Sequence, residues 1–229
     1  MQFDLDARTA SLSAGEFSQF AVGPQDAGGG QQGIWRAQLG THWHNELRAQ
    51  AMAGHGAAAE FEIAIEGRIF HRGWTLTLTG RIDQLIRTDA GLALREIKTV
   101  MRPLPADEAA LRADYPEYFV QLATYAVLRR IAAPTDKVRA ELVFVETTSG
   151  LAQTLSLTTA DEALFRAQLE RVAEFLDLRQ RARERLRGLR FRAPFAELRP
   201  GQETTEAELI STFEKHPLVL FEAPTGFGK

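Results

Sequence analysis

The spacing of apolar and polar positions divides the chain into helices and strands. One segment repeats apolar residues every four positions, which predicts a helix over residues 34–52. These residues are Trp35, Leu39, Trp43, Leu47 and, after them, Ala51. From residue 59 apolar and polar positions alternate, with turn residues at 71–73 and 88–91, so three consecutive strands are expected. The elements predicted after these strands are a helix over 117–131, a hairpin of strands over 138–146 and 151–157, and a long helix from 159 to about 187.

Capping and turn residues predict the structure of the remaining segments. Ser13 is a candidate N-cap for a short element that ends near Phe20, and residues 23–33 are typical of a Gly- and Gln-rich loop. Residues 101–116 contain three prolines and predict a loop with one helical turn. Thr159 and Glu162 have the spacing of a capping box at the start of the long helix.

The order of these elements indicates the fold class. A helix, three strands, a helix, two strands and a long helix predict an α/β or α+β fold with a mixed sheet at its centre. At 229 residues the chain is long enough for one large domain, or for one domain and a fragment of another.

Composition narrows the classes of protein without selecting one. The net charge of −3 gives no general sign of nucleic-acid binding, so that function must be argued from local features. The absence of cysteine excludes disulfides, zinc–thiolate sites and cysteine-ligated iron–sulfur clusters from this segment. No apolar run approaches the roughly 18–20 residues that span a membrane, and the N-terminus lacks a signal-peptide pattern. A cytoplasmic protein without a membrane partner is therefore expected.

Charged residues on the second and third predicted strands carry the most chemical information. Asp83 lies on one strand, and Glu96 and Lys98 are two residues apart on the next. Because side chains alternate along a strand, Glu96 and Lys98 share a face while Ile97 points into the opposite layer. Two carboxylates beside a lysine provide a cation site next to a group that can position or deprotonate water, as metal-assisted phosphodiester hydrolysis requires.

The register of this hairpin decides whether the carboxylates meet. A two-residue turn at Asp89–Ala90 places Asp83 directly opposite Glu96, where facing Cβ atoms are about 4.5–5.5 Å apart. A turn at Ala90–Gly91 instead places Asp83 opposite Lys98 and leaves the two carboxylates diagonal. An exposed Glu-x-Lys that serves only solubility is the alternative, and the preceding Gly-x-x-Asp at residues 80–83 makes it the minority interpretation.

Two predicted helices carry further candidates. His42 and His44 lie on the first long helix, and a neutral imidazole beside carboxylates suits manganese better than calcium. Gln121 and Tyr125 are four residues apart on the later helix, so both side chains can face the same site. Taken alone, a histidine on a helix surface or a tyrosine at helical spacing is more often structural.

Together these residues resemble the PD-(D/E)xK nuclease superfamily, and within it the RecB-type branch. The pattern of that branch is Gly-x-x-x-His on a helix, Gly-x-x-Asp on a strand, (Asp/Glu)-x-Lys on the next strand, and Gln-x-x-x-Tyr on a helix. The chain has, in this order, Gly40 and His44, Gly80 and Asp83, Glu96 and Lys98, and Gln121 and Tyr125. The resemblance covers roughly residues 30–160 and implies a restriction-endonuclease-like core.

The resemblance also implies a role for each matched residue. The side chains of His44, Asp83 and Glu96, with the backbone carbonyl of Ile97, would hold Mg²⁺ or Mn²⁺. Lys98 would orient or deprotonate the attacking water, and Gln121 and Tyr125 would steady the lysine, the water or the DNA backbone. The spacing favours His44 over His42 as the ligand. Several RecB-type nucleases carry four cysteines for an iron–sulfur cluster, and this chain has none.

The C-terminal end contains a second pattern. Residues 222–229 have the form of a phosphate-binding loop after an apolar strand at 218–221, in which Gly226 and Gly228 would admit the phosphates and Lys229 would contact them. Upstream, residues 198–202 resemble the adenine-reading glutamine motif of superfamily-two helicases, with Gln202 as the reading residue. The two motifs resemble the start of a DinG/XPD-type helicase, which implies ATP as its cofactor.

This second resemblance predicts a division of the chain. Residues 1–193 would be the nuclease domain with a basic C-terminal helix, and 194–229 would be the start of a helicase that is cut off at its phosphate-binding loop. The chain is then expected to be the N-terminal part of a longer nuclease–helicase.

An arginine-rich segment at 179–192 has two interpretations of equal weight. It either follows DNA phosphates between motor and nuclease, or it is a solvated helix end whose arginines pair with nearby acidic residues. These acidic residues are Glu170, Glu174, Asp177 and Glu184.

Three functions follow from these patterns. The first is a metal-dependent DNA nuclease that acts on single strands or ends in DNA repair or processing. The second is a catalytically silent module that holds DNA for the helicase, which the intact Asp83, Glu96 and Lys98 disfavour. An ATPase confined to this chain is excluded because the remaining helicase motifs are missing.

Overall fold

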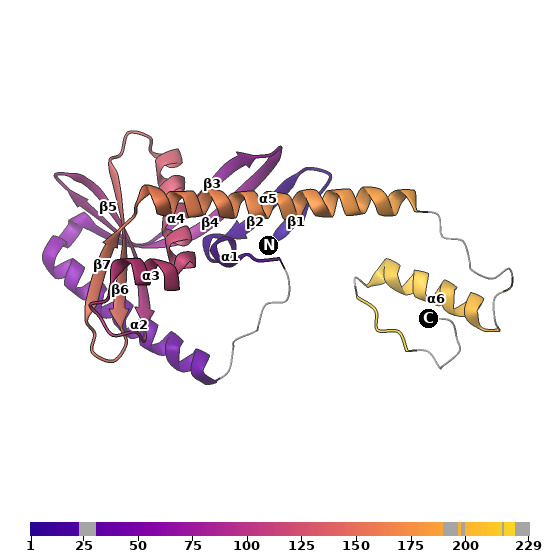
Figure 1. The fold of residues 1–229 in the computed structure, drawn as a ribbon, viewed down its shortest axis with the longest axis horizontal. Coiled ribbons are helices and arrows are strands. Elements are labelled where there is room, and N and C mark those ends of the chain that lie inside the picture. Colours follow the sequence, from indigo (N-terminus) through magenta and orange to yellow (C-terminus); the bar gives the residue numbers. More distant parts are fainter. Residues whose placement is uncertain (23–30, 190–196, 198–199, 217, 223–229) are drawn as a thin grey trace. The chain divides into compact units, whose positions relative to one another are not determined.

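A seven-stranded mixed β-sheet forms the centre of the N-terminal part of the protein (Figure 1). The computed structural model describes residues 1–22, 31–189, 197, 200–216 and 218–222, and for 31–39 the backbone alone. Contacts divide the chain into two units, Met1–Arg183 and Glu184–Lys229. The predicted boundary between nuclease and helicase, after residue 193, falls outside the described residues and stays a prediction.

Parallel and antiparallel pairs both occur in the sheet. Its strands are β1 (Gln2–Asp4), β2 (Thr9–Ser13), β3 (Ala59–His71), β4 (Trp74–Thr88), β5 (Gly91–Val100), β6 (Val138–Glu146) and β7 (Ala152–Ser156). They are joined in the order β1-β2-β4-β5-β6-β7, and β3 pairs with β4. The β2–β4 and β5–β6 pairs are parallel, and the other pairs are antiparallel.

Helices cover both faces of this sheet (Figure 1). On one face, α2 (Gln31–His55) packs Trp43 and Leu47 against Ile97. The opposite face is covered by α1 (Ala14–Gln19), α3 (Glu108–Asp114), α4 (Pro116–Ala132) and α5 (Thr159–Gly188). The predicted α/β fold with a central mixed sheet, as in a restriction-endonuclease-like core, is thereby confirmed.

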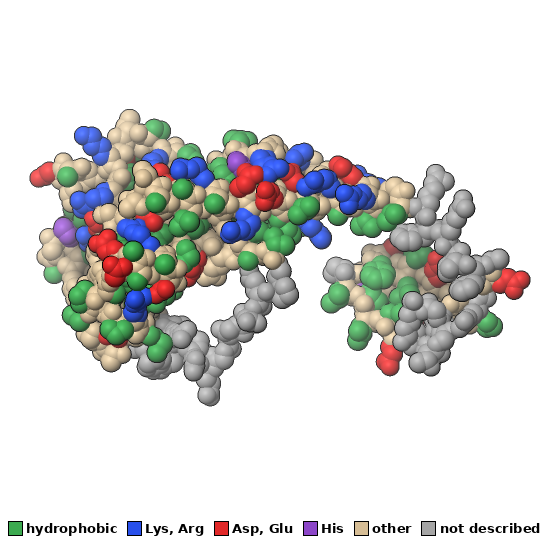
Figure 2. All heavy atoms as spheres, in the orientation of Figure 1, with side chains coloured by type: hydrophobic (Ala, Val, Ile, Leu, Met, Phe, Trp, Pro, Cys, Tyr) green, Lys and Arg blue, Asp and Glu red, His purple; other side chains and the backbone are tan. Residues whose placement is uncertain are grey.

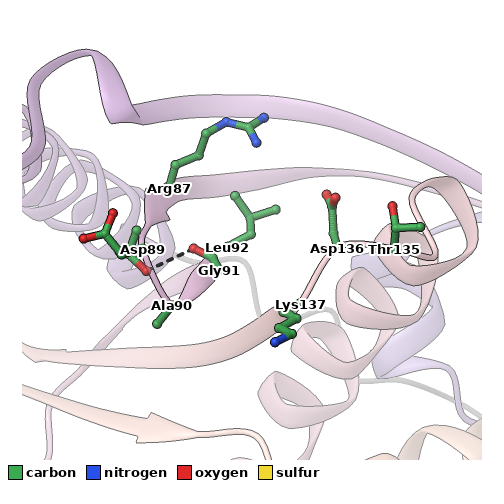
Figure 3. A pocket seen from close by; sticks show the side chains of 9 residues that line it. Arg87, Asp89, Ala90, Gly91, Leu92, Thr135, Asp136 and Lys137 are labelled. Atoms are coloured by element: carbon green, nitrogen blue, oxygen red, sulfur yellow. Dashed lines mark hydrogen bonds between the residues drawn. The ribbon is translucent and has the colours of Figure 1, made fainter.

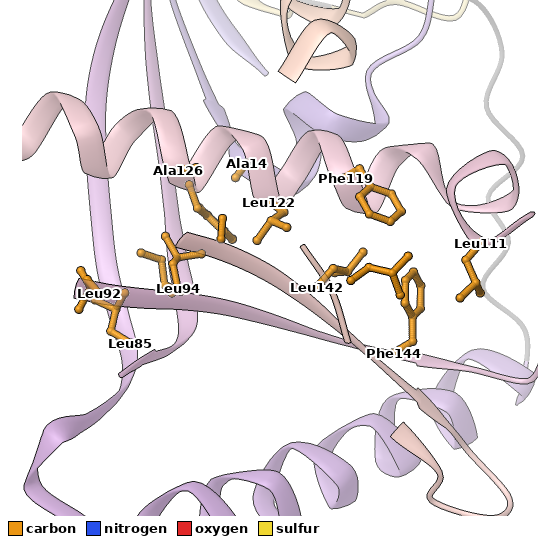
Figure 4. Packing of buried hydrophobic residues seen from close by; sticks show 14 of the residues in the cluster. Ala14, Leu85, Leu92, Leu94, Leu111, Phe119, Leu122, Ala126, Leu142 and Phe144 are labelled. Atoms are coloured by element: carbon orange, nitrogen blue, oxygen red, sulfur yellow. The ribbon is translucent and has the colours of Figure 1, made fainter. Parts of the chain in front are cut away.

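The main hydrophobic core lies between α4 and the sheet. Figure 4 shows Phe119 and Leu122 of α4 directed toward Leu142 and Phe144 of β6. All four side chains are fully buried, so this layer fixes α4 over β5 and β6. The position of α4 is important for the site because Gln121 and Tyr125 belong to the same helix.

Strand β4 has two different neighbours along one of its edges. β3 pairs with β4 from Trp74 to Ile86 and so occupies the other edge. On the shared edge, β2 pairs with Thr75–Thr79 and β5 pairs with Gln84–Thr88. Residues 80–83 therefore face a gap in the described ladder, because β5 turns away from β4 to continue along β6 up to Val100. We call this gap the fork.

Most predicted elements are confirmed, and several details differ. The predicted loop over 101–116 contains α3, a helix of seven residues, and α2 begins at Gln31, inside the loop predicted over 23–33. Strands β1 and β2 were not predicted, because they are only three and five residues long. The predicted capping box at Thr159 and Glu162 is wrong by one residue. The Thr158 hydroxyl accepts from the Asp161 amide at 3.3 Å, and the Asp161 carboxylate accepts from the Thr158 amide at 2.8 Å. Asp161 replaces Glu162 because it also binds Arg112, which anchors the start of α5 to α3.

Acidic and basic side chains are intermixed along α5, as Figure 2 shows on one face. Glu170 and Asp177, which were predicted as partners of the arginine-rich segment, bind Arg72 at the β3–β4 turn. Asp177 also accepts from the Trp74 indole at 2.8 Å. These contacts tie α5 to the hairpin. Arg190 and Arg192 of the segment lie outside the described residues.

The second unit contains the last residues of α5 and, among its described residues, the helix α6 (Gln202–Lys215). Gln202, the candidate adenine-reading residue, is its first residue. Residues 218–222 form no strand, so the predicted apolar strand at 218–221 is wrong. A strand requires a hydrogen-bonding partner, and the described part of this unit offers none. Gly226, Gly228 and Lys229 lie outside the described residues. In the part of the chain that the structure describes, no helix has the length and apolar character to cross a membrane.

Candidate active site

Asp83 lies at the fork, one position beyond the last pair of the β4–β5 ladder. The ladder pairs Arg87 with Leu92 and ends with Gln84 opposite Arg95, so the predicted register is confirmed. At the next position Asp83 Oδ2 accepts a hydrogen bond from the Ile97 amide at 2.7 Å. The carboxylate thus takes the place of a backbone acceptor at the point where the two strands separate.

Glu96 and Lys98 project from β5 toward the α4 face, as predicted, while Ile97 packs on the α2 face. Lys98 Nζ is 2.9 Å from Glu96 Oε1. The side chain of Glu96 is only 3% exposed, so its other oxygen, Oε2, is shielded from water. Oε2 nevertheless has no hydrogen-bond partner. A buried, unpartnered carboxylate oxygen is costly for the fold, so it indicates a function that the fold alone does not require.

Burial changes the protonation of this cluster. It raises the pKa of Glu96 to about 8, because the attraction of Lys98 offsets the loss of solvent only in part and the nearby Asp83 carboxylate adds repulsion. Burial likewise raises the pKa of Asp83, against the opposing effects of His44 and the Ile97 amide. Burial alone would lower the pKa of Lys98, but the Glu96 and Asp83 carboxylates outweigh it and the net pKa is raised.

His44 reaches the fork from α2. Its Nδ1 is 3.7 Å from Asp83 Oδ1, and the side chain is partly exposed. His42, two residues earlier, is exposed and its ring lies edge-on to Trp43. The structure therefore brings His44, and not His42, to the carboxylates.

Gln121 and Tyr125 face the fork from α4. Gln121 Nε2 donates to the Tyr125 hydroxyl at 3.0 Å, and the backbone of Arg81 also binds this hydroxyl. A Cβ atom at Gly80 would lie 2.4 Å from Tyr125 Cε1, so the ring fits only because residue 80 is glycine. Two motifs that are far apart in sequence, Gly-x-x-Asp and Gln-x-x-x-Tyr, thus meet in one contact.

Two residues at the site were not predicted. Glu62 on β3 has a carboxylate oxygen within 4.8 Å of donor atoms of His44 and Asp83. The β3–β4 register places Glu62 opposite Asp83. A hairpin with a two-residue turn at residues 72–73 would have predicted this pair from the sequence. Tyr118 lies under Lys98, with Nζ 5.3 Å from the ring centroid. Tyr118 precedes Gln121 by three residues, so both lie on one face of α4, and this spacing could have identified Tyr118 from the sequence.

The residues present fit a hard or borderline divalent cation. They offer an imidazole nitrogen and several carboxylate oxygens, one of which, Glu96 Oε2, is buried without a partner. These groups line a cavity of about 530 Å³ together with Gly80, Arg81, Gln121 and Tyr125. The carbonyl of Ile97 stays a predicted ligand.

A second cavity of about 450 Å³ lies at the β4–β5 turn (Figure 3). Its charged side chains Arg87, Asp89 and Lys137 are exposed, and Thr88 Oγ1 donates to the Gly91 carbonyl within the turn. The described residues that line it hold no buried polar atom without a partner. Similar volumes therefore do not distinguish the cavities, whereas buried charge does, and the candidate active site is at the fork.

The carboxylates, the imidazole and the lysine that meet at the fork of a mixed sheet are groups that metal-assisted hydrolysis can use. The sequence profile of the PD-(D/E)XK nuclease superfamily matches residues 4–204, and the chain belongs to this superfamily. No curated protein sequence matches the chain.

Solved structures with a similar fold include three at low sequence identity. The protein SSO0001 is 21% identical, with a TM-score of 0.41 over 58% of this chain and 60% of its own. A putative exonuclease from Eubacterium rectale is 13% identical, with a TM-score of 0.44 over 75% of this chain and 66% of its own. A phage-related exonuclease from Haemophilus somnus is 14% identical, with a TM-score of 0.41 over 72% of this chain and 79% of its own. The chain thus spans less than two thirds of the first two.

Proposed function

We propose that the chain is a metal-dependent deoxyribonuclease whose active site is the fork. The observation that carries this proposal is the convergence of Asp83, Glu96 and Lys98 around one buried carboxylate oxygen without a partner. Membership of the PD-(D/E)XK superfamily supports phosphodiester hydrolysis as the reaction.

His44, Asp83 and Glu96, with the Ile97 carbonyl, would hold Mg²⁺ or Mn²⁺. When bound, such a cation lowers the pKa of a coordinated water and polarises a phosphoryl oxygen. The Ile97 amide orients Asp83 through its 2.7 Å hydrogen bond, and burial of Glu96 keeps competing water away from the same place.

Lys98 contributes as a cation in this proposal. The neighbouring Glu96 and Asp83 carboxylates raise the pKa of Lys98, which favours the ammonium form, and an ammonium can orient water and offset charge on the phosphate. The ring of Tyr118 and the Glu96 carboxylate hold the ammonium in place. Gln121 and Tyr125 limit the fork on the α4 side, where they can contact the lysine, water or DNA backbone.

The RecB-type assignment and the helicase in cis belong to the same proposal. The four ordered motifs support the branch, and the Gln202 and Lys229 motifs support an ATP-dependent DinG/XPD-like helicase downstream. Single-stranded DNA or DNA ends would then be the substrate, delivered by the motor.

Cleavage of labelled single- and double-stranded DNA with Mg²⁺ or Mn²⁺ tests the activity. We expect Asp83→Ala and Lys98→Ala to abolish cleavage, because they remove a cation ligand and the positioned ammonium. Lys137→Ala is the matched control, since Lys137 is exposed at the second cavity. It should cleave like the unchanged protein.

Two outcomes would contradict the nuclease. Equal residual cleavage in all variants would mean a contaminating enzyme. DNA binding without cleavage under either metal would favour the silent binding module. Substrates blocked at the 5′ or 3′ end would further separate the ends that the enzyme uses.

A further inference from the structure

Glu62 has an unusual backbone conformation near the start of β3. Its φ is 53°, a left-handed backbone conformation that residues other than glycine rarely adopt within a strand. Regular pairing with β4 holds on both sides, with Phe61 opposite Gln84 and Ile63 opposite Ile82. The register places Glu62 directly opposite Asp83 of β4, so the distortion lies beside the fork.

The distortion reverses the faces of both strands. Phe61 packs with Ile86 on the α2 face, whereas Ile63 packs with Ile82 on the α4 face. In a regular strand residues 61 and 63 would share a face. The reversal therefore occurs at Glu62, and on β4 it occurs at Asp83.

This geometry brings the Glu62 carboxylate to the fork. One carboxylate oxygen of Glu62, one of Asp83 and a ring nitrogen of His44 all lie within 4.8 Å of one another. Glu62 Oε2 also accepts from Arg81 Nε at 2.5 Å. The ion pair engages one oxygen, and a carboxylate has a second oxygen with which to bind a cation.

A separate observation indicates that the same cavity takes a ligand. Glu96 lines this cavity with a side chain that is only 3% exposed, and its Oε2 has no hydrogen-bond partner. Glu96 lies outside the group formed by His44, Glu62 and Asp83, so Asp83 stands between two sets of donor atoms.

We propose that Glu62 is an additional cation ligand, which binds Mn²⁺ or Mg²⁺ together with His44 and Asp83. The inference deepens the proposed function and rests on it for the identity of the site. The strained backbone is then explained, since a regular strand would direct residue 62 elsewhere. The ion pair with Arg81 competes with the cation for one Glu62 oxygen and leaves the other oxygen available.

Titration of the full chain with Mn²⁺ in a calorimeter tests this assignment. Glu62→Gln keeps the shape of the side chain and removes its charge, so Mn²⁺ affinity should fall roughly 10- to 100-fold, as for other groups that support a metal. Glu66→Gln is the matched control, because Glu66 is an exposed glutamate four residues further along β3. Its affinity should equal that of the unchanged protein.

Two further variants separate ligation from a structural role. Glu62→Gly relieves the left-handed conformation, so the metal-free protein should melt at the same or a higher temperature while Mn²⁺ binds as weakly as in Glu62→Gln. Arg81→Gln removes the competing ion pair and should leave Mn²⁺ affinity unchanged or higher. If Glu62→Gln and Arg81→Gln both lower the melting temperature and neither changes Mn²⁺ affinity, Glu62 serves only the ion pair and the assignment is wrong.

Comparison with DNA cleavage keeps the two proposals distinct. If the unchanged protein cleaves DNA and Glu62→Gln binds Mn²⁺ and cleaves equally well, only the role of Glu62 fails. If the protein binds Mn²⁺ through Glu62 but cleaves no DNA, only the nuclease function fails. A protein that takes up no Mn²⁺ overturns both.

Discussion

Glu96 and Glu141 are buried carboxylates on neighbouring parallel strands, with exposed fractions of 3% and 6%. Glu141 has a partner for each oxygen, since Arg95 Nε lies 2.8 Å from Oε2 and Arg139 Nε lies 2.7 Å from Oε1. Glu96 binds Lys98 through one oxygen and leaves the other without a partner.

The difference teaches how to recognise a site among buried charges. A carboxylate whose oxygens are both matched by guanidinium groups contributes to the fold and needs nothing further. A carboxylate that remains half satisfied costs stability, and proteins retain such groups where function requires them. Glu141 is thus expected to be structural and Glu96 functional. Replacing each glutamate in turn with glutamine, which removes its charge, should separate the two roles.

The largest expected effect is on DNA cleavage. Glu96→Gln should reduce the single-turnover cleavage rate with Mn²⁺ by roughly 10²- to 10³-fold, since metal-assisted stabilisation supplies several kcal/mol. Glu141→Gln should cleave at nearly the original rate, because its partners lie on the far side of the sheet. An equal loss in both variants would remove the distinction.

The next effect concerns stabilisation by the metal. Saturating Mn²⁺ should stabilise the unchanged protein by about 2.7 kcal/mol at a hundredfold excess over Kd, because the cation binds the folded state. Thermal unfolding should show this gain in Glu141→Gln and a much smaller gain in Glu96→Gln. Addition of EDTA should return the first two proteins to their metal-free melting temperatures.

Metal-free stability should reverse the order of the two variants. Glu141→Gln leaves Arg95, which is partly buried, without its charged partner, and should lower the free energy of unfolding by about 1–3 kcal/mol. Glu96→Gln leaves Lys98 without its charged partner, but it also removes the repulsion between Glu96 and Asp83 and the unpartnered oxygen, so its free energy of unfolding in EDTA should fall less than that of Glu141→Gln. Urea denaturation at pH 7 measures both, and a loss in Glu96→Gln that equals or exceeds the loss in Glu141→Gln would contradict the comparison.

The last difference between the two variants is in the pH dependence of their stability. Because burial raises the pKa of Glu96 from 4.5 to about 8, the folded state retains a proton that the unfolded state loses between these values. The metal-free protein should therefore lose up to about 1.4 kcal/mol of stability per pH unit across this window as pH rises. Glu96→Gln should flatten the profile in urea denaturation from pH 5 to 8. Parallel profiles for the two proteins would show that Glu96 titrates normally.

Much of the site followed from short-range pattern. The β4–β5 turn and the alternation of β5 were sufficient to pair Arg87 with Leu92 and to bring Asp83 beside Glu96. The same arithmetic applied to the β3–β4 turn would have placed Glu62 opposite Asp83. Register within a hairpin is local, because a turn of known length and a period of two determine it.

The sequence by itself determined strands β3 to β7, the main helices, and the carboxylates and lysine that gather on one hairpin. Only the tertiary structure decided that β5 leaves β4 at Arg95, that Tyr125 enters beside Gly80, and that the faces of β3 reverse at Glu62. These features lie where β2 pairs with β4, β6 pairs with β5, and α4 packs against both strands. Their outcome depends on contacts between segments far apart in the chain, which no local pattern encodes.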